Sequence, residues 1–400
     1  MGAYDIAVAG CGPAGLAAAL LLARDGHRVR LFERFDTPQP VGSGLLMQPT
    51  GQAVLRRLGL EDRLLEAGAR VERLFGRAMP SGRVVLNVHY AWLQGGHAGI
   101  GVHRAALFDI LHDAVRAAAV PIETGRTIIG SAPDGAGRRL RFADGESERF
   151  ELVVDALGAA SALAPPCGRQ LAYGALWASL AWPEGGPFDA AALEQRYVAA
   201  RKMVGVLPIG RTAPDAPRQA AFFWSLRADQ LEDWRVAGLK PWKAEVAALW
   251  PETRWFLDQI DDPAQLVFAR YAHRTLSAPA EPALIHIGDA WHSTSPQLGQ
   301  GANMALLDAW ALAQGLRETN GLVAGLAAAV ALRRDHVRLF QALSILFTPA
   351  YQSDGTFLPF VRDRIVAPFI TWWPATIIQA GMVTGLTGNP LAALGLDRQA

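Results

Sequence analysis

Apolar and polar residues follow two different periods along this chain, and each period predicts a type of element. Residues 4–9 (YDIAVA) predict an apolar strand, residues 16–25 an Ala- and Leu-rich helix, and residues 27–33 (HRVRLFE) a second strand. Far along the chain, residues 284–287 predict a short buried strand, and a helical pattern begins after Gly301. Both ends of the chain therefore predict strand–turn–helix units.

The stretch after the first unit mixes helix and strand patterns. Residues 50–60 predict a helix with Thr50 as its N-cap, and residues 71–102 alternate and predict several strands. Residues 104–115 then predict a helix with one apolar face. A sheet element is therefore expected between two helices of the first half.

A second sheet is expected in the middle of the chain. Four alternating segments predict antiparallel strands, over residues 171–182, 195–210, 219–227 and 265–276. The Pro-rich residues 211–219 predict a hairpin loop, and residues 230–257, which contain four tryptophans, predict a helical cover. Five side chains of these and the earlier strands could face a pocket, although packing is the commoner role for each: His89, Tyr90, His97, Tyr197 and Trp224.

The end of the chain is unusually apolar. A helix is expected after Gly321, and no Asp, Glu, Lys or Arg occurs between Arg364 and Asp397. Several prolines interrupt this segment, whereas a spanning helix needs about 20 continuous apolar residues, so we expect no transmembrane helix. A helical segment that closes over the core is favoured. Peripheral contact with a membrane surface through Trp372 and Trp373, or an entrance for a lipophilic substrate, is the alternative.

Composition narrows the class of protein. The 400 residues are 51% apolar and 19% charged with a formal net charge of +1, which is typical of a globular protein. No basic cluster interleaved with aromatic residues is present, so nucleic acid is not an expected partner. Cys11 and Cys167 form neither a metal-binding spacing nor a disulfide framework. Because no signal peptide is apparent either, we expect a cytoplasmic protein.

Glycines mark the turn of the first unit. GCGPAG stands between the strand and the helix, which is the required context of a dinucleotide-binding G-x-G-x-x-G motif. Gly10 allows the tight turn, Gly12 lets the backbone approach a pyrophosphate, and Gly15 lets the helix pack against the strand. Glu33 ends the second strand, where a carboxylate can bind the hydroxyls of an adenosine ribose. FAD and NAD both use this arrangement.

The late unit, LIHIGDAWHSTSPQLGQGANMALLD, has a ligand-binding pattern of its own. Gly299 and Gly301 precede a helix, whose free N–H groups suit an anionic or electron-rich ligand edge. Asp289 can accept hydrogen bonds from ligand hydroxyls, although an ordinary strand–loop–helix unit would give the same pattern. Arg104 lies in the first turn of its helix, which is unfavourable for the helix dipole and indicates either an anionic partner or a solvated side chain.

Three motifs resemble one family over most of the chain. GCGPAG with Glu33, HRAALFDIL and GDAWHSTSPQLGQGANMALLDA are similar to the flavoprotein monooxygenases of the aromatic-hydroxylase superfamily (para-hydroxybenzoate hydroxylase-like, group A). The resemblance implies an α/β fold, in which a Rossmann-like FAD-binding domain of the glutathione-reductase type carries an inserted antiparallel-sheet substrate domain and a C-terminal helical, apolar segment. The implied divisions are 1–70, 100–166 and 277–340 for FAD binding, 71–99 and 167–276 for substrate, and 341–400 for the C-terminal segment.

The same resemblance implies an activity and a set of site residues. FAD, dioxygen and NAD(P)H would hydroxylate an aromatic or apolar small molecule through a flavin hydroperoxide. His292 and Pro296 are the candidates for shaping the catalytic flavin site. The implied cofactor-binding residues are Gly10, Gly12, Pro13, Ala14, Gly15, Glu33, Arg34, Arg104, Asp289, Pro296, Gly299, Gly301, Ala302 and Asn303. The sequence predicts no metal site and no particular oligomeric state.

One motif departs from the family pattern. Relatives have a strand followed by Ala-Asp-Gly and later Ser and Arg, whereas this chain has Leu157 at the Asp position and Ala164 at the Arg position. Asp155 lies two residues earlier on the same strand face, about 7 Å away and too far to replace that contact. Direct reduction by NAD(P)H is therefore in question. The alternative is an FAD-dependent oxidase, dehydrogenase or halogenase-like enzyme reduced by its substrate or a flavin reductase, although the halogenase motif Trp-x-Trp-x-Ile-Pro is absent.

Overall fold

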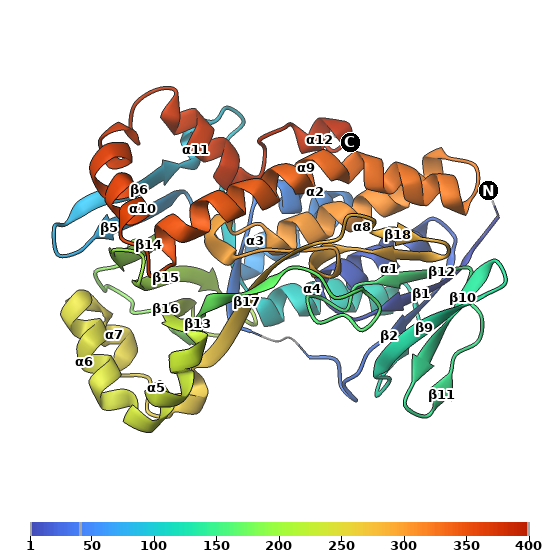
Figure 1. The fold of residues 1–400 in the computed structure, drawn as a ribbon, viewed down its shortest axis with the longest axis horizontal. Helices are drawn as coiled ribbons and strands as arrows, with labels where there is room; N and C mark the ends of the chain where they lie inside the picture. Colours follow the sequence, from blue (N-terminus) through green and yellow to red (C-terminus); the bar gives the residue numbers. More distant parts are fainter. Residues whose placement is uncertain (1, 40–41, 398–400) are drawn as a thin grey trace.

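A six-stranded sheet joins the two ends of the chain (Figure 1). The computed structural model describes residues 2–39 and 42–397. The strand order is β18 (Ala280–Glu281), β19 (Leu284–His286), β12 (Leu152–Asp155), β1 (Asp5–Ala9), β2 (Arg28–Phe32) and β8 (Ile122–Glu123). All neighbouring pairs are parallel except β18–β19. The early and late strands that the sequence predicts are thus separated only by β12.

Helices cover one face of this sheet and a small sheet covers the other. α1 (Pro13–Arg24), α4 (Arg104–Ala117), α8 (Gly301–Glu318) and α9 (Leu322–Tyr351) share one hydrophobic core with it. On the opposite face, β9 (Ile128–Asp134), β10 (Gly137–Phe142) and β11 (Gly145–Glu146) pack through Leu140 and Phe142 against Phe32. The predicted Rossmann-like FAD-binding fold is therefore confirmed.

Two predicted helix starts are wrong. α1 begins at Pro13 rather than Leu16, because the glycine turn leads directly into the helix and proline suits the first helical position. α2 (Pro49–Arg57) also begins with a proline, and its N-cap is Gln48. Thr50 is therefore buried in the first turn and does not cap the helix. α3 (Glu61–Ala67) follows.

An eight-stranded sheet forms the second layer. Its order is β20 (His292–Ser293), β17 (Val267–Thr275), β13 (Arg169–Ala181), β16 (Gln219–Arg227), β15 (Lys202–Gly210), β14 (Ala192–Val198), β5 (Arg73–Ala78) and β6 (Arg83–His89). The predicted segment 195–210 is two strands, since Ala199 adopts a positive φ of 50° and turns the chain. The predicted hairpin between β15 and β16 is confirmed. So is the helical cover, α5 (Leu231–Ala237), α6 (Leu239–Leu249) and α7 (Arg254–Leu257).

The two layers are tied together beside the candidate site. A three-stranded sheet of β3 (Gly44–Met47), β7 (Gly99–His103) and β4 (Ala69–Val71) packs against β15. The contact is close, since a Cβ on Gly101 would lie 1.9 Å from the carbonyl oxygen of Pro208. Strand β20, within the late motif, pairs with β17 of the large sheet. The late motif therefore belongs to both layers.

The C-terminal segment is helical but broken, as its prolines predict. It comprises α10 (Phe357–Val361), the π-helical turn η7 (Arg362–Val366), the 3₁₀ turn η8 (Ala367–Phe369), α11 (Ala375–Thr384) and α12 (Pro390–Ala393). Its last part closes over the core, where Trp310 Nε1 donates a 2.9 Å hydrogen bond to the carbonyl of Leu394. Within residues 2–39 and 42–397, no helix combines the length and apolarity needed to cross a bilayer. The domain boundaries stay a prediction, and their outer ends, Met1 and residues 398–400, lie outside the described residues.

Candidate FAD site

The three motif glycines are required for three different reasons. Gly10 has a φ of +101°, and a Cβ there would lie 2.8 Å from the carbonyl oxygen of Ala156. A Cβ on Gly15 would lie 1.9 Å from the carbonyl oxygen of Gly10, so this position allows α1 to pack on the turn. A Cβ on Gly12 would meet no protein atom within 4 Å. The space beside Gly12 is therefore open, as close approach by a ligand requires.

Free backbone donors and a fixed carboxylate surround this open space. Gly12 is the N-cap of α1 and supplies no side-chain cap, so the first N–H groups of the helix are available to an anion. Glu33 accepts hydrogen bonds from the backbone N–H groups of Cys11 at 3.0 Å and Phe35 at 3.1 Å. The carboxylate oxygens have further lone pairs for ribose hydroxyls. Burial and the Glu33 charge raise the pKa of the Cys11 thiol to about 12, so this cysteine stays protonated.

Asp289, from the late motif, lies at the other end of the site. Its carboxyl lies among protein atoms, and this desolvation raises its pKa, although His292 and Arg104 act in the opposite direction. The same side chain is nevertheless exposed, and so are Pro296 and Gly301. A Cβ on Gly301 would lie 4.0 Å from Asp289 Oδ1. The Asp289 carboxyl is therefore surrounded by protein atoms on one side and open to solvent on the other, and we refer to this open side as the cleft.

Arg104 lies beside the same opening. The start of its helix is held by a 2.9 Å hydrogen bond from its backbone N–H to the carbonyl of Ser43. Its exposed side chain lies across Gly42, where a Cβ would come within 2.9 Å of Arg104 Cδ. Burial raises the pKa values of Asp289 and Tyr271, and the Arg104 charge opposes this rise in both; no described residue forms an ion pair with Arg104. Arg34 is also exposed, but its guanidinium lies 4.5 Å from the ring centre of Phe35.

The two halves of the site adjoin. Gly288 has a φ of +58°, and a Cβ there would lie 3.2 Å from Ala305 and 3.3 Å from Ala14. This glycine therefore lets the late motif approach both α1 and α8. The N-terminus of α8 also has no side-chain cap. A carboxylate at the end of the second strand, two uncapped helix starts and an arginine with no ion-pair partner among the described residues fit an elongated, doubly phosphorylated dinucleotide such as FAD.

A buried charge network supports the late motif from behind. His292 Nε2 lies 2.6 Å from Asp308 Oδ2, and Arg333 Nε donates a 2.8 Å hydrogen bond to Asp308 Oδ1. Gly288 N–H donates to the same carboxylate at 2.9 Å. Burial alone would raise the pKa of Asp308, but His292 and Arg333 outweigh it and lower the pKa to about 2. Asp308 therefore stays ionised and holds the backbone immediately before Asp289.

The network continues into the C-terminal segment. Arg333 Nη1 lies 2.9 Å from His336 Nδ1, and His336 Nε2 lies 3.0 Å from the carbonyl oxygen of Gly385. Burial, and secondly the Arg333 charge, lower the pKa of His336 to about 3. Sequence reasoning identified His292 but missed Arg333 and His336. Because His292 is buried against Asp308, its predicted role in shaping catalysis stays a prediction.

Asn303 is buried and fully engaged with the backbone. Its Oδ1 accepts a 2.8 Å hydrogen bond from the N–H of Gln48, and its Nδ2 donates to the carbonyls of Leu46 and Gly299. Gly299 has a φ of +62° and turns the chain into α8. Asn303 thus connects this turn to the β3–α2 segment. Its predicted contact with the flavin ring stays a prediction, as does that of the half-buried Ala302.

Three aromatic side chains of the large sheet, Trp177, Phe223 and Tyr271, form what we call the aromatic roof, on the face turned away from the helical cover. Trp177 and Phe223 stack with ring centres 4.6 Å apart, and Trp177 Nε1 donates a 2.8 Å hydrogen bond to the Tyr271 hydroxyl. On the same strand face as Trp177, Ser179 Oγ lies 2.8 Å from Ser43 Oγ of the FAD-binding layer. Burial raises the pKa of Tyr271, which stays protonated. Sequence reasoning missed this roof.

Strand alternation could have separated these roof residues from those of the opposite sheet face. Trp224, which the sequence made a pocket candidate, packs instead in the core beneath the helical cover, together with Trp242. Tyr90 and Tyr197 are both fully buried, and their hydroxyls donate to Gln48 and Gln195. The period of two along β16 places neighbours Phe223 and Trp224 on opposite faces. The prediction for Trp224 was therefore wrong because it assigned this side chain to the other face of β16.

The segment that departs from the family pattern is a rigid loop. Asp155 is completely buried and accepts hydrogen bonds from Leu157 N–H at 3.0 Å and Ser161 Oγ at 2.6 Å. Its Oδ2 also lies 2.6 Å from His286 Nδ1. Asp155 therefore stabilises the loop and does not reach the cleft. Arg274 of β17 donates to the carbonyls of the same loop at residues 159 and 165, a contact that sequence reasoning missed.

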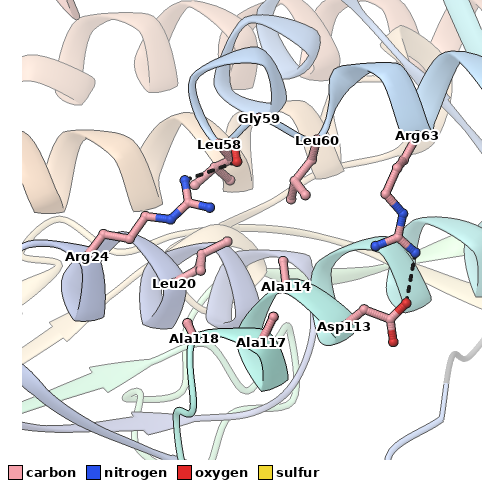
Figure 2. Close-up of a pocket in the computed structure, with 10 residues that line it drawn as sticks. All are labelled: Leu20, Arg24, Leu58, Gly59, Leu60, Arg63, Asp113, Ala114, Ala117 and Ala118. Atoms are coloured by element: carbon pink, nitrogen blue, oxygen red, sulfur yellow. Dashed lines mark hydrogen bonds and ion pairs between the residues drawn. The ribbon is translucent and has the colours of Figure 1, made fainter.

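The larger of two described cavities lies away from all these residues. Figure 2 shows this space of about 480 Å³ where the ends of α1 and α4 meet the turn between α2 and α3. Arg24 donates to the carbonyl of Leu58 there, and Arg63 pairs with Asp113 at 2.8 Å. None of the predicted site residues lines it. Size alone therefore does not identify the site.

Comparisons with known proteins agree with this geometry. A family model described as an FAD binding domain matches residues 3–171. The chain is 28% identical over 339 residues to a 6-hydroxynicotinate 3-monooxygenase of Pseudomonas fluorescens, covering 78% of this chain and 82% of the relative. It is 29% identical over 352 residues to an FAD-dependent urate hydroxylase of Klebsiella pneumoniae, covering 83% and 86%.

A solved structure has the same fold over nearly the whole chain. Klebsiella pneumoniae HpxO complexed with FAD and uric acid superposes with a TM-score of 0.79 at 22% identity, covering 97% of this chain and 98% of that one. The glycine turn with Glu33, the late motif and these relatives agree on one cofactor. The chain is thus similar over most of its length to FAD-dependent flavoprotein monooxygenases of group A, and its residues 3–171 match an FAD binding domain.

Proposed function

We propose that this protein hydroxylates a small, electron-rich aromatic molecule that binds between the aromatic roof and the late motif. In the overall reaction, one atom of dioxygen replaces an aromatic hydrogen as a hydroxyl group and the other leaves as water. NAD(P)H and a proton supply the two electrons and the hydrogen that this balance requires. The single observation that carries the proposal is the accessible yet desolvated Asp289, whose neighbour Arg104 also acts electrostatically on Tyr271 of the aromatic roof.

FAD, when bound, supplies the oxygen-activating chemistry, and the chain supplies its position. Under this proposal the N–H groups that begin α1 bind the pyrophosphate, with Arg104 as the countercharge. Glu33 binds the adenosine ribose, and Asp289 binds hydroxyls of the chain that leads to the ring. The uncapped start of α8 would stabilise negative charge on the flavin ring when FAD is bound. Asp308 positions Asp289 through the Gly288 N–H and is itself no catalytic residue.

The proposed substrate class follows from the roof. The stacked indole and phenyl rings suit the binding of a flat aromatic molecule, and water would be excluded between that molecule and the roof. Two hydroxyls, of Tyr271 and Ser179, can orient a polar substituent by hydrogen bonding. The two relatives named above act, by their names, on 6-hydroxynicotinate and urate, which are both flat heteroaromatic molecules. This similarity supports a phenol or hydroxylated heteroaromatic compound.

A second candidate concerns the electron donor. Leu157 is partly buried against an apolar cluster, and Asp155 is turned into the loop interior. No carboxylate therefore extends from residues 155–157 towards the cleft. This favours the alternative in which a flavin reductase or the substrate itself, rather than direct NAD(P)H binding, reduces the cofactor.

The test is substrate-stimulated oxidation of NADH and NADPH by purified holoprotein, with a panel of phenols and hydroxylated pyridines under ¹⁸O₂. The proposal expects one ¹⁸O atom in the product. Stimulated oxidation without a flavin reductase supports direct reduction, and activity only with a reductase supports the alternative donor. Aromatic substrates that reduce the flavin anaerobically, with no ¹⁸O in any product, would overturn hydroxylation in favour of an oxidase or dehydrogenase.

Roof variants test the substrate position. Tyr271→Phe keeps the ring and removes the hydroxyl, so we expect KM to rise about tenfold, the order of one lost hydrogen bond to a polar substituent. Trp255→Leu is the matched control, because Trp255 is exposed on α7, behind the roof. An unchanged KM in Tyr271→Phe would remove this hydroxyl from the substrate site.

A further inference from the structure

Five aromatic side chains of the C-terminal segment are exposed on one corner of the molecule. We define the aromatic patch as Phe357, Phe360, Phe369, Trp372 and Trp373, and Trp373 is 77% exposed. Exposed aliphatic residues of the same segment extend it, from the end of α9 to α11. Figure 1 shows this segment beside strands β5 and β6, at the opposite end of the molecule from β9–β11. The rings of Phe369 and Trp372 are in contact, with centres 5.2 Å apart, and so many exposed large apolar side chains in one segment are typical of an interaction site.

The patch is held outwards by a well-packed support. Ala367, Ile370 and Ala380 of the same segment are buried. The guanidinium of Arg362 is also buried and donates to the carbonyls of Ala350 at 2.7 Å and Ala199 at 3.0 Å. The exposed aromatic side chains are therefore the outer face of a folded element.

The two acidic residues within this part of the chain are paired with arginines, although Arg227 also pairs with Asp229. Asp354 pairs with Arg227, and Asp363 pairs with Arg362 at 2.6 Å. Between Arg364 and Asp397 the sequence has no acidic residue. Within the described segment 339–396, therefore, no carboxylate next to the aromatic patch is left without an arginine partner.

Three arginines next to the patch have no acidic partner among the described residues. Arg83 donates to the carbonyl of Asp363 at 2.7 Å, and Arg201 donates to the carbonyl of Asp354 at 3.3 Å. Arg364 is exposed in η7, within the patch segment itself. Carbonyl contacts leave the charge of a guanidinium uncompensated. The aromatic patch is thus bordered by positive charge.

We propose that the aromatic patch docks on the surface of an anionic phospholipid bilayer. Tryptophan prefers the interface between headgroups and acyl chains, and unpaired arginines attract anionic headgroups. Since the described helices are too short or too polar to span a bilayer, the protein lies on the membrane through this segment. A second copy of the chain fits less well. A symmetric dimer would place the patch against itself and bring six unpaired arginine charges, three from each copy, close together.

The experiment is co-sedimentation of the FAD-loaded protein with vesicles of phosphatidylcholine, with and without about one third phosphatidylglycerol. We expect binding to the anionic vesicles that weakens with salt, because surface charges are screened. Trp372→Ala/Trp373→Ala should lower the partition coefficient about tenfold or more, since binding scales with the apolar area inserted. Trp255→Ala is the matched control, because it removes an exposed tryptophan elsewhere, and it should bind like the unmodified protein.

The outcomes are separable from folding and from the proposed hydroxylase activity. FAD content and the thermal midpoint of the double variant should match those of the unmodified protein. Arg364→Gln should weaken binding to anionic vesicles while leaving binding to neutral ones unchanged. No vesicle binding, or equal binding by the double variant, would overturn the proposal. So would sedimentation velocity that finds a dimer converted to monomers by the double variant without any vesicle binding, which would identify the patch as a contact between copies.

Discussion

Substituting alanine at two glycines of the same turn should separate ligand binding from folding. Gly12 has a φ of −72° and a ψ of 175°, which alanine adopts without strain, and its Cβ would meet no protein atom within 4 Å. Gly12→Ala should therefore change the free energy of unfolding of the apoprotein by less than about 0.5 kcal/mol. The added methyl group would instead occupy the space that we assign to the pyrophosphate. We expect FAD affinity to fall at least tenfold, or by about 1.4 kcal/mol.

Gly15→Ala should instead destabilise the fold, because its added methyl group would clash with the protein itself. Its Cβ would lie 1.9 Å from the carbonyl oxygen of Gly10, so the backbone of the turn or the helix must move. Such overpacking costs about 1–3 kcal/mol in unfolding free energy, and the apoprotein should lose stability before any ligand is added.

The assay is urea unfolding of both apoproteins, followed by tryptophan fluorescence, together with FAD titration by quenching of flavin fluorescence. Gly12→Ala should show unmodified stability with weakened binding, and Gly15→Ala should show lowered stability. The reasoning is refuted if Gly12→Ala binds FAD as tightly as the unmodified protein does, because the open space would then not be where the pyrophosphate lies.

Three further changes test the rest of the site. Arg333→Met removes the guanidinium from the buried Asp308 carboxylate, which keeps only His292 and the Gly288 N–H, and should lower the unfolding free energy by about 3–5 kcal/mol. Arg317→Met, at a solvent-accessible pair, should cost less than about 1 kcal/mol, and equal losses in urea unfolding would contradict the network's role. His336 has a pKa of about 3 in the folded state against 6.5 ordinarily, so its contribution to stability is complete above pH 6.5 and is lost as pH falls towards 3. His336→Gln should therefore reduce the acid-side slope of stability by up to about 1.4 kcal/mol per pH unit in that window, and an unchanged slope would count against the buried neutral imidazole. Asp289→Ala should weaken FAD binding about tenfold without lowering apoprotein stability, since it removes a desolvated carboxyl that forms no ion pair with any described residue; titration that finds unmodified affinity would remove Asp289 from the site.

Local motifs made most of the FAD-binding layer predictable. The strand, glycine turn and helix at each end of the chain depend on short-range rules, and their residues appear where those rules put them. The starts of α1 and α2 were misjudged because Pro13 and Pro49 occupy the first helical position, where proline is favoured. That preference was available in the sequence.

The supporting contacts were not predictable in the same way. Arg333 pairs with Asp308 across 25 positions of sequence, and Ser179 meets Ser43 across 136. The apolar period of a helix or strand predicts which of its faces is buried, but it does not predict which distant residue packs against that face. The roof required knowledge of which face of β13 and β16 turns towards the cleft. That face is decided by the helical cover packing on the other side, which is a tertiary effect.

The central claim is that one elongated cofactor occupies both the Gly12–Glu33 half and the Asp289–Gly301 half of the site. It is tested most directly by titrating the apoprotein separately with FAD and with FMN, which lacks the adenylate half. The account predicts one FAD per chain, with a structured flavin absorption band, and binding of FMN at least 100-fold weaker, since the ribose and pyrophosphate contacts together are worth about 3 kcal/mol or more. Equal affinity for the two flavins, or no uptake of either, would contradict it.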